Sequence, residues 1–389
     1  MRTIQLRFLL ITFAFWFSHY VYLPMLAPYL KERGANYAYV GLVLASYGVL
    51  QVLLRLPLGI VSDFKQIRLP FVRWGVFAGM VSALGFAVTD GLGWSLVWRT
   101  LAGLSAATWV VFTVTYLSHY QKEEAAKAMG MIQFVSVLSQ LLAMVASGYL
   151  VDLWGWRSVF VAGAGIGAIG FVLTLAERDR QARSERPVDI SQLAGVLKEQ
   201  RLIRLSWLTL LAHCILFSTI YGFLPAYALS LGCGESAVSY LVVSFMVPHA
   251  ISSILTASTI VPRLGTWGTL IGGFLGSALS LLLIPLGPHL LWLCLTQLLN
   301  GFALGMVLPL LMGMVGQTVS AEKRATAMGF FQTLLAIGIF SGPFLAGGFN
   351  HLYGLFGGFV FAGLVGLLGA GLAIQWRFRD SSLSKVNRK

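Results

Sequence analysis

The sequence predicts an all-α polytopic membrane protein in which twelve transmembrane helices form two six-helix repeats. Three observations predict this class: an apolar composition, a series of apolar runs of spanning length, and patterns that recur in the two halves of the chain. Of the 389 residues, 57% are hydrophobic and 11% are charged, whereas soluble domains carry about 25% charged residues. This composition excludes a soluble enzyme and leaves little of the chain outside the bilayer.

The apolar runs approach the roughly 20 residues that a membrane-spanning helix needs. The first run follows Arg2 and Arg7 and continues to about Leu30, which is too long for the core of a signal peptide. Glycine and proline recur within the runs, and membrane helices tolerate both because neighbouring segments satisfy the freed backbone groups. The predicted spans are 7–30, 38–61, 70–88, 93–117, 127–151, 158–176, 202–229, 235–260, 267–285, 290–315, 326–349 and 354–375.

Lysine and arginine are distributed unevenly between the loops on the two sides of the membrane. One side would hold both termini and the central connection and carries most of the 27 basic residues, whereas the loops on the other side carry Lys31, Arg33 and Arg157. Since positive residues concentrate in cytoplasmic loops, we expect both termini to be cytoplasmic in a multi-pass protein of the cell (inner) membrane. The net charge of +13 is spread over short loops, so no nucleic-acid binding is expected.

The chain divides into two similar halves, residues 1–176 and 202–389, joined by a cytoplasmic linker over 177–201; the second half ends in a cytoplasmic tail. The linker contains the most polar run of the chain and ends in a segment with the spacing of a short amphipathic helix. The tripeptide Ala-Met-Gly at Ala128 recurs at Ala327, and Gly148 recurs as Gly347, both with a shift of 199. Parallel six-span repeats of this kind typically place a substrate site near the midplane.

Motifs along the whole chain resemble those of the major facilitator superfamily of transporters. The loop after the second span resembles the family's cytoplasmic motif G-x-x-x-D-[RK]-x-G-[RK], motif A. It departs from the motif at Phe64, which replaces a basic residue, and lacks the later glycine. The resemblance implies a conformational latch formed by Gly59, Asp63, Lys65 and Arg68.

Two further motifs lie within predicted spans. Residues from Arg99 to Ala107 resemble motif B, R-x-x-x-G-x-x-x-A, of proton-coupled members, in which the arginine is implied to modulate proton affinity. Motif C of antiporters, G-x-x-x-G-P-x-x-G-G, normally lies in the fifth span, but a similar pattern lies here in the eleventh. The drug and small-molecule efflux branch is the most similar overall. The eleventh-span residues, expected to serve helix packing, are Gly338, Gly342, Pro343, Gly347 and Gly348.

Polar residues inside the predicted spans are the candidates for a solute and proton pathway, because polar groups within a bilayer are costly. No predicted span carries a carboxylate near its middle. Intramembrane arginines either pack against helices and snorkel or capture an anionic group. A buried histidine can titrate near neutral pH. Amides either line a cavity or join helices. The candidates are His19, Tyr22, Arg55, Arg99, Gln133, Ser136, Gln140, Tyr221, His249, Gln297, Asn300 and Gln332.

The expected function is secondary active transport of a small organic solute by alternating access, with proton-coupled export (antiport) as the first choice. The alternatives are proton- or ion-coupled import of an anionic or zwitterionic solute and a non-transporting membrane sensor. Two intramembrane arginines without a central carboxylate favour an anionic or zwitterionic solute. No enzyme, cofactor or metal site is expected, because catalytic motifs are absent and the three cysteines lack metal-ligand spacing. We expect a monomer in the lipid bilayer.

Overall fold

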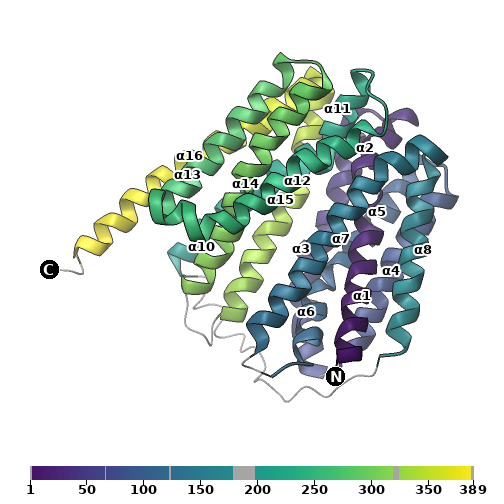
Figure 1. The fold of residues 1–389 in the computed structure, drawn as a ribbon, viewed down its shortest axis with the longest axis horizontal. Helices are drawn as coiled ribbons and strands as arrows, with labels where there is room; N and C mark the ends of the chain where they lie inside the picture. Colours follow the sequence, from purple (N-terminus) through teal and green to yellow (C-terminus); the bar gives the residue numbers. More distant parts are fainter. Residues whose placement is uncertain (1, 66, 122–123, 178–197, 319–323, 387–389) are drawn as a thin grey trace. The chain divides into compact units, whose positions relative to one another are not determined.

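The computed structural model describes residues 2–65, 67–121, 124–177, 198–318 and 324–386, and every regular element in these ranges is a helix. Eleven segments of the described chain are long and apolar enough to cross a bilayer. The chain forms two compact units: Met1–Val188 with Gly234–Ser239 (unit 1), and Asp189–Cys233 with Tyr240–Lys389 (unit 2). Figure 1 colours the helices of unit 1 from purple to teal and most of those of unit 2 from green to yellow.

Unit 1 contains the first six spans, and two of these are broken. The first span breaks after α1 because Pro24, in the first turn of α2, has no N–H to continue the helical hydrogen bonds. The fourth span breaks at Thr108, whose hydroxyl donates to the carbonyl of Ser105 (2.7 Å). The helices are α1 (Arg2–Tyr20), α2 (Leu23–Glu32), α3 (Tyr37–Lys65), α4 (Leu69–Val88), α5 (Leu92–Ala107), α6 (Trp109–Leu117), α7 (Ala125–Trp154) and α8 (Arg157–Leu175).

Unit 2 contains the other six spans and several irregular helical turns. The seventh span is α10, η2 and α11, in which η2 is a π-helical turn. The amphipathic helix predicted in the linker lies outside the described residues, apart from the short stretch 198–201. The elements are α10 (Gln200–Ser218), η2 (Thr219–Phe223), α11 (Leu224–Ser230), α12 (Ala237–Leu255), η3 (Thr256–Ile260), α13 (Val261–Leu283), η4 (Ile284–Leu286), α14 (Leu290–Thr318), α15 (Arg324–Tyr353) and α16 (Leu355–Val386).

The eighth and ninth spans follow each other without the loop predicted at 261–266. The helical run Ala237–Leu286 has 50 residues and would be about 75 Å long if straight, against a hydrocarbon core of about 30 Å. It turns at Gly265, whose φ of 71° is favourable only for glycine. The run therefore divides into two spans, and the twelve-span arrangement predicted from the sequence is confirmed.

Large apolar side chains cover the outer faces of the helices. Trp74, Ile254 and Leu291 are 68%, 75% and 67% exposed, which would be costly in water over so many positions. A lipid environment removes this cost. Their exposure supports the assignment of these helices to a membrane.

Glycines of the eleventh-span motif lie against the seventh span within unit 2. A Cβ atom at Gly338 or Gly342 of α15 would collide with the backbone carbonyl of Leu210 or Cys214 in α10. These two glycines therefore allow the two backbones to touch, as in other small-residue contacts between membrane helices. Pro343 and Gly347 are buried in the same helix, whereas a Cβ at Gly348 would meet open space.

Candidate functional site

The most unusual group of side chains in unit 1 surrounds a buried arginine in α5. We call this group the Arg99 cluster and define it as Arg99 with His19, Tyr22 and Tyr47. Arg99 is 1% exposed, and its guanidinium carbon lies 4.1 Å from the ring centre of Tyr47 and 5.9 Å from that of Tyr22. The cluster places one fixed positive charge between aromatic rings inside a helical bundle.

The position of Arg99 is set by a glycine one helical turn further along α5. A Cβ atom at Gly103 would collide with the carbonyl oxygen of Tyr47 in α3, so only glycine permits this approach of the two helices. Because residues four apart share a helix face, Arg99 also faces α3. The glycine of motif B therefore serves to bring the arginine onto the Tyr47 ring.

The guanidinium group of Arg99 is incompletely satisfied. Its Nε and Nη2 atoms have no hydrogen-bond partner among the described residues. A cation–π contact offsets part of the desolvation cost, by about 2 kcal/mol when water is excluded, but it leaves these in-plane N–H donors unused. The geometry leaves a planar, charged donor pair available to an acceptor that is not part of the described chain.

His19 completes the cluster with an unused acceptor. Its Nδ1 lies 2.7 Å from the carbonyl oxygen of Phe15, and since a carbonyl only accepts, Nδ1 carries the proton of the neutral ring. Nε2 is then an acceptor that receives no hydrogen bond from the described residues, and the backbone of Ala102 in α5 also lies near the ring. The ring fits because Gly79 in α4 has no side chain: a Cβ there would lie 2.7 Å from Cε1 of His19.

Arg99 and His19 are close enough to interact electrostatically. His19 is 2% exposed, so little water screens the interaction. A buried base and a fixed cation lie near the same tyrosine ring: the ring centres of His19 and Tyr47 are 6.4 Å apart, and the guanidinium carbon of Arg99 is 4.1 Å from the ring centre of Tyr47.

A ladder of hydrogen bonds along α3 orients the second intramembrane arginine. Nε2 of Gln51 donates to the carbonyl of Tyr47 (2.9 Å), and Nη2 of Arg55 donates to Oε1 of Gln51 (2.7 Å). Arg55 is 8% exposed, so it is held inside unit 1 rather than extended toward the membrane surface. Sequence reasoning missed Tyr47 and Gln51, although their spacing of eight and four residues from Arg55 placed all three on one face of the helix.

Unit 2 repeats this arrangement with neutral residues. A Cβ at Gly301 of α14 would collide with the carbonyl of Phe245 in α12, which is the Gly103–Tyr47 contact shifted by 198 residues. The same shift places Gln297 at the position of Arg99 and His249 at that of Gln51. Gln297 is fully buried, and neither of its amide atoms has a partner among the described residues.

Two neighbouring side chains in unit 2 are partly satisfied. Oδ1 of Asn300 accepts from the hydroxyl of Ser277 (2.7 Å), while Nδ2 of Asn300 has no described partner. The ring of His249 stacks on Phe245 at 5.5 Å, and its Nδ1 is also without a described partner. Unit 2 therefore offers buried neutral donors and acceptors, and unit 1 offers buried cations.

The other predicted pathway residues make different contacts. The hydroxyl of Ser136 donates to Ile132 in its own helix (2.7 Å), and the hydroxyl of Tyr221, in the π-helical turn η2, lies 3.7 Å from Sδ of Met246. Three glutamines are half-buried on α7 and α15: Gln133, Gln140 and Gln332.

The predicted latch is only partly described. A Cβ at Gly59 would make an ordinary contact with Val110 at 3.7 Å, so its glycine identity is not required by packing in this conformation. Arg68 precedes the first turn of α4. The side chains of Asp63 and Lys65 lie outside the described part of the chain.

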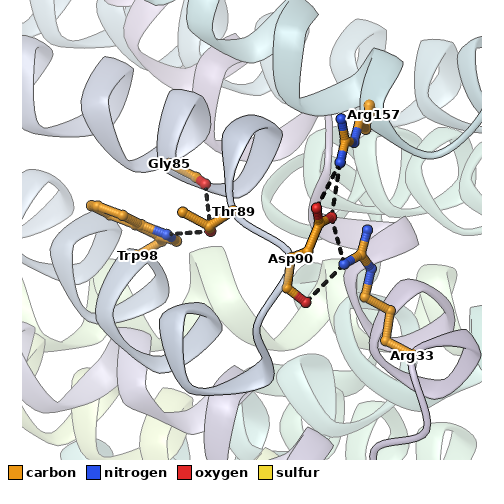
Figure 2. Close-up of polar contacts among 6 residues, drawn as sticks. All are labelled: Arg33, Gly85, Thr89, Asp90, Trp98 and Arg157. Atoms are coloured by element: carbon orange, nitrogen blue, oxygen red, sulfur yellow. Dashed lines mark hydrogen bonds and ion pairs between the residues drawn. The ribbon is translucent and has the colours of Figure 1, made fainter.

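At one end of unit 1, an exposed carboxylate joins three segments, as Figure 2 shows. Both oxygens of Asp90 accept from Nη2 of Arg157 (2.8 and 2.9 Å), and Nη1 of Arg33 lies 2.7 Å from Oδ1. The hydrogen bonds from Arg157, then those from Arg33, lower the pKa of Asp90 below its usual value. These three residues come from loops predicted to share one side of the membrane, so the sequence carried a signal for this cluster.

The Asp90 turn also sets the start of α5. Oγ1 of Thr89 donates to the carbonyl of Gly85 (2.7 Å) and accepts from Nε1 of Trp98 (2.9 Å), as Figure 2 also shows. Trp98 immediately precedes Arg99 in the chain. The turn therefore fixes the helix that carries the buried arginine.

At the other end of unit 1, two arginines hold the last turn of α8. Nη2 of Arg73 donates to the carbonyl of Glu177 (2.8 Å) and its Nε to that of Thr174 (3.2 Å). Nη1 of Arg7 lies 3.3 Å from Oε1 of Glu177, which is 5% exposed. These contacts satisfy carbonyls that a helix end leaves unpaired.

Comparisons with known proteins identify the family. The sequence model described as Major Facilitator Superfamily matches residues 8–271 and 206–389. The chain is 26% identical to the multidrug resistance protein MdtG of Citrobacter koseri over 85% of its length and 84% of the relative's. It is 24% identical to the inner membrane transport protein YajR of Escherichia coli K12, covering 92% and 78% of the two chains.

Solved structures of transporters share the fold at lower identity. A bacterial homologue of the human lysosomal transporter Spinster, inward-facing and occupied, has a TM-score of 0.81 at 14% identity over 96% of both chains. The nucleoside transporter NupG has a TM-score of 0.72 at 18% identity over 98% of this chain and 99% of NupG. The human organic anion transporter MFSD10 has a TM-score of 0.67 at 18% identity over 96% and 99%. The chain belongs to the major facilitator superfamily and is a multi-pass membrane transporter of a small solute.

Proposed function

We propose that this transporter moves a small organic anion together with a proton, by alternating access between the two sides of the membrane. The observation that carries the proposal is the buried guanidinium of Arg99, whose Nε and Nη2 have no described partner. A carboxylate or similar planar anion accepts from two adjacent guanidinium donors at once. An anionic solute would therefore satisfy the donors that the protein leaves open.

The charge balance of the described spans supports an anionic solute. Their acidic residues occur only at the ends, at Glu32 and Asp152, while Arg55 and Arg99 are buried within unit 1. A lipophilic cation would be repelled by the positive charge of these arginines, whereas an anion would be attracted. In unit 2 the position equivalent to Arg99 is the neutral Gln297, so this charge preference comes from unit 1.

The proximity of His19 to Arg99 supports coupling to a proton. The guanidinium repels a protonated imidazole, and an anion bound to Arg99 would cancel much of that repulsion. Anion and proton would then favour each other's binding, with a coupling free energy of the usual order, about 1–3 kcal/mol. Because the two ligands bind together, they cross together, and an inward proton gradient drives solute uptake.

Proton-coupled export is the second candidate, and the relatives favour it. Several curated relatives are described as multidrug resistance proteins, and a proton-coupled exporter would exchange its solute for protons. In an antiporter the solute and the proton compete, which requires a solute that repels the proton or shares its site. One solved structure with the same fold is described as an organic anion transporter, which agrees with the first candidate in solute class.

Transport by the purified chain in proteoliposomes tests both candidates. A panel of labelled organic anions, zwitterions and cations is offered under an imposed pH gradient with the membrane potential clamped at zero. Anion accumulation in vesicles with an acidic exterior supports symport, and accumulation in vesicles with an acidic interior supports antiport. If folded protein moves cations and no anion, the proposed solute class is wrong.

The motif A latch and the membrane orientation stay proposals from sequence. If the carboxylate of Asp63 stabilises one conformer by about 1–3 kcal/mol, Asp63→Asn should shift the balance of inward and outward states and slow transport without loss of folded protein. Unchanged transport and unchanged conformational balance would contradict the carried-over role. For the orientation, Ala35 is buried, so the cysteine is introduced instead at the neighbouring exposed Glu32. It should react with an impermeant maleimide in intact cells, and one at Ser384 should not.

A further inference from the structure

Unit 2 contains a cavity that is unrelated to the buried polar groups described above. Its volume is about 490 Å³, within the range of about 300–1,000 Å³ that small-ligand sites occupy. Three helices contribute to its wall. The lining residues are Glu199, Gln200, Arg201, Arg204, Thr266, Trp267 and Met314.

The cavity lies at the ends of spans rather than at their middle. The seventh span begins at Gln200, and the tenth ends at Thr318, four residues after Met314. The ninth span begins after the turn at Gly265, which Trp267 follows by two residues. All three helices therefore bring a span end to the cavity, which places it at the boundary between hydrocarbon and water.

Two arginines give the cavity a positive wall. Arg201 and Arg204 are three residues apart and so share a face of α10. Nη2 of Arg204 donates to Oε1 of Gln200 (3.0 Å), which holds its guanidinium along the helix surface. The carboxylate of Glu199 accepts from the backbone N–H of Arg201 (3.3 Å) and so caps the helix.

The lining residues from the other two helices are largely aromatic and apolar. Trp267 is half-buried, and Met314 is 5% exposed, while Thr266 adds a hydroxyl. Tryptophan is enriched where membrane helices meet the headgroups. A cavity lined by arginines and by an indole suits a ligand that is both anionic and amphiphilic.

We propose that this cavity binds a phosphate-bearing anion, with Arg201 and Arg204 contacting the phosphate and Trp267 and Met314 contacting the attached carbon chain. Arginine is well suited to phosphate because its donors form a planar fork. Basic pockets between membrane helices commonly hold anionic lipid headgroups. The same chemistry is available from a phospholipid headgroup and from a soluble organic phosphate, so the source is decided by experiment.

The test uses the full-length protein in phosphatidylcholine vesicles that contain a small fraction of phosphatidylglycerol with brominated chains. Bromine quenches tryptophan at short range, and the chain has 11 tryptophans, so the relevant signal is the difference between wild type and Trp267→Phe. We expect a saturable quenching component that the variant lacks. Brominated phosphatidylcholine at the same fraction should produce much less of it.

Charge variants test the phosphate contact. Each cation near a membrane surface contributes about 1 kcal/mol, so the double variant Arg201→Gln, Arg204→Gln should bind phosphatidylglycerol roughly 25-fold more weakly. Arg377→Gln is the matched control, because Arg377 is also exposed and lies near the end of a span but does not line the cavity. If the double variant unfolds, as judged by thermal melting, the single variants should each weaken binding about fivefold.

A competition with soluble glycerol phosphate distinguishes the two sources. No displacement of the lipid supports a headgroup site, and displacement at low concentration supports a site for soluble organic phosphate. Quenching that is equal for the two lipids, or unchanged in the charge variants, would overturn the proposal. The experiment measures binding and not transport, so its result tests this proposal independently of the proposed solute and proton coupling.

Discussion

Replacing Arg99 should separate transport from stability. Arg99→Gln removes the positive charge and the planar donor pair but keeps a polar side chain of moderate length. The substitution leaves Gly103, and with it the contact between α3 and α5, unchanged. We therefore expect a folded protein with a strongly weakened affinity for an anionic solute.

The size of the effect follows from the unused donors. A hydrogen bond to a charged group contributes about 1.5–3 kcal/mol, and Nε and Nη2 of Arg99 together offer two such bonds. Loss of both predicts a rise in the apparent KM of at least about 100-fold, at 1.4 kcal/mol per factor of ten. Arg99→Lys keeps the charge above the Tyr47 ring but loses the planar donor pair, so its apparent KM should rise about tenfold.

The stability of Arg99→Gln should rise or stay the same, although its affinity for the anion falls. Arg99→Gln gives up a cation–π contact of about 2 kcal/mol, but it also removes a buried charge without an acidic partner, whose desolvation costs several kcal/mol. The melting temperature of the variant in detergent should be equal to or above that of the wild type. This combination distinguishes a ligand-binding arginine from one that only packs helices.

The assay is initial-rate uptake of the best anion in proteoliposomes at several solute concentrations. Protein incorporation is matched between variants, and melting is followed by tryptophan fluorescence. A KM for Arg99→Gln within twofold of the wild-type value would refute the role of Arg99 in binding. A large loss of melting temperature would instead assign it to helix packing.

Three further predictions concern unit 1. Gly103→Ala should lower stability by about 1–3 kcal/mol because the new methyl group collides with a backbone carbonyl. Gly93→Ala on the same helix, where a Cβ meets open space, should be neutral or slightly stabilising. Thermal melts of both variants check this. The two arginine partners of Asp90 lower its pKa. The contribution of the Asp90 carboxylate to stability is therefore complete above the ordinary pKa of a carboxyl group and is lost as the pH falls through the lowered pKa. The melting-temperature difference between wild type and Asp90→Asn should be constant from about pH 7 to about pH 5 and shrink below about pH 4, and a difference that changes most near neutral pH would contradict this. The buried Glu177 pairs with the partly exposed Arg7, so Glu177→Gln should lower the free energy of unfolding by about 1–2 kcal/mol. Asp152→Asn, at an exposed position, should not lower it. Chemical denaturation of the two variants checks this.

The spans were predictable because bilayer thickness imposes their length on the sequence. Apolar runs of about 20 residues recur along the whole chain, and the structure places a helix on each. The interruptions within spans were not predictable in the same way. The helix of the fourth span breaks at Thr108, where the apolar run continues, and that of the eighth span extends through the π-helical turn Thr256–Ile260 to the turn at Gly265, where a loop was expected.

The candidate site was only partly predictable. Arg99 and His19 stood out because charged and titratable side chains are rare in an apolar span. Tyr47 gave no such signal, since a tyrosine in a membrane helix is common, and its role appears only through the approach of α3 to Gly103. The equivalence of Gln297 with Arg99 was also hidden, because the two side chains differ in chemistry and share only their spacing from a glycine.

The most direct test of the central claim is gradient-driven accumulation by His19→Gln. Glutamine can keep a hydrogen bond to the carbonyl of Phe15 but cannot bind a proton, so exchange of solute across the membrane should persist while accumulation against a gradient is lost. Wild-type vesicles with an acidic exterior should accumulate the anion, and the variant should only equilibrate it. If His19→Gln accumulates the anion as the wild type does, the proton does not pass through His19 and the proposed coupling is wrong.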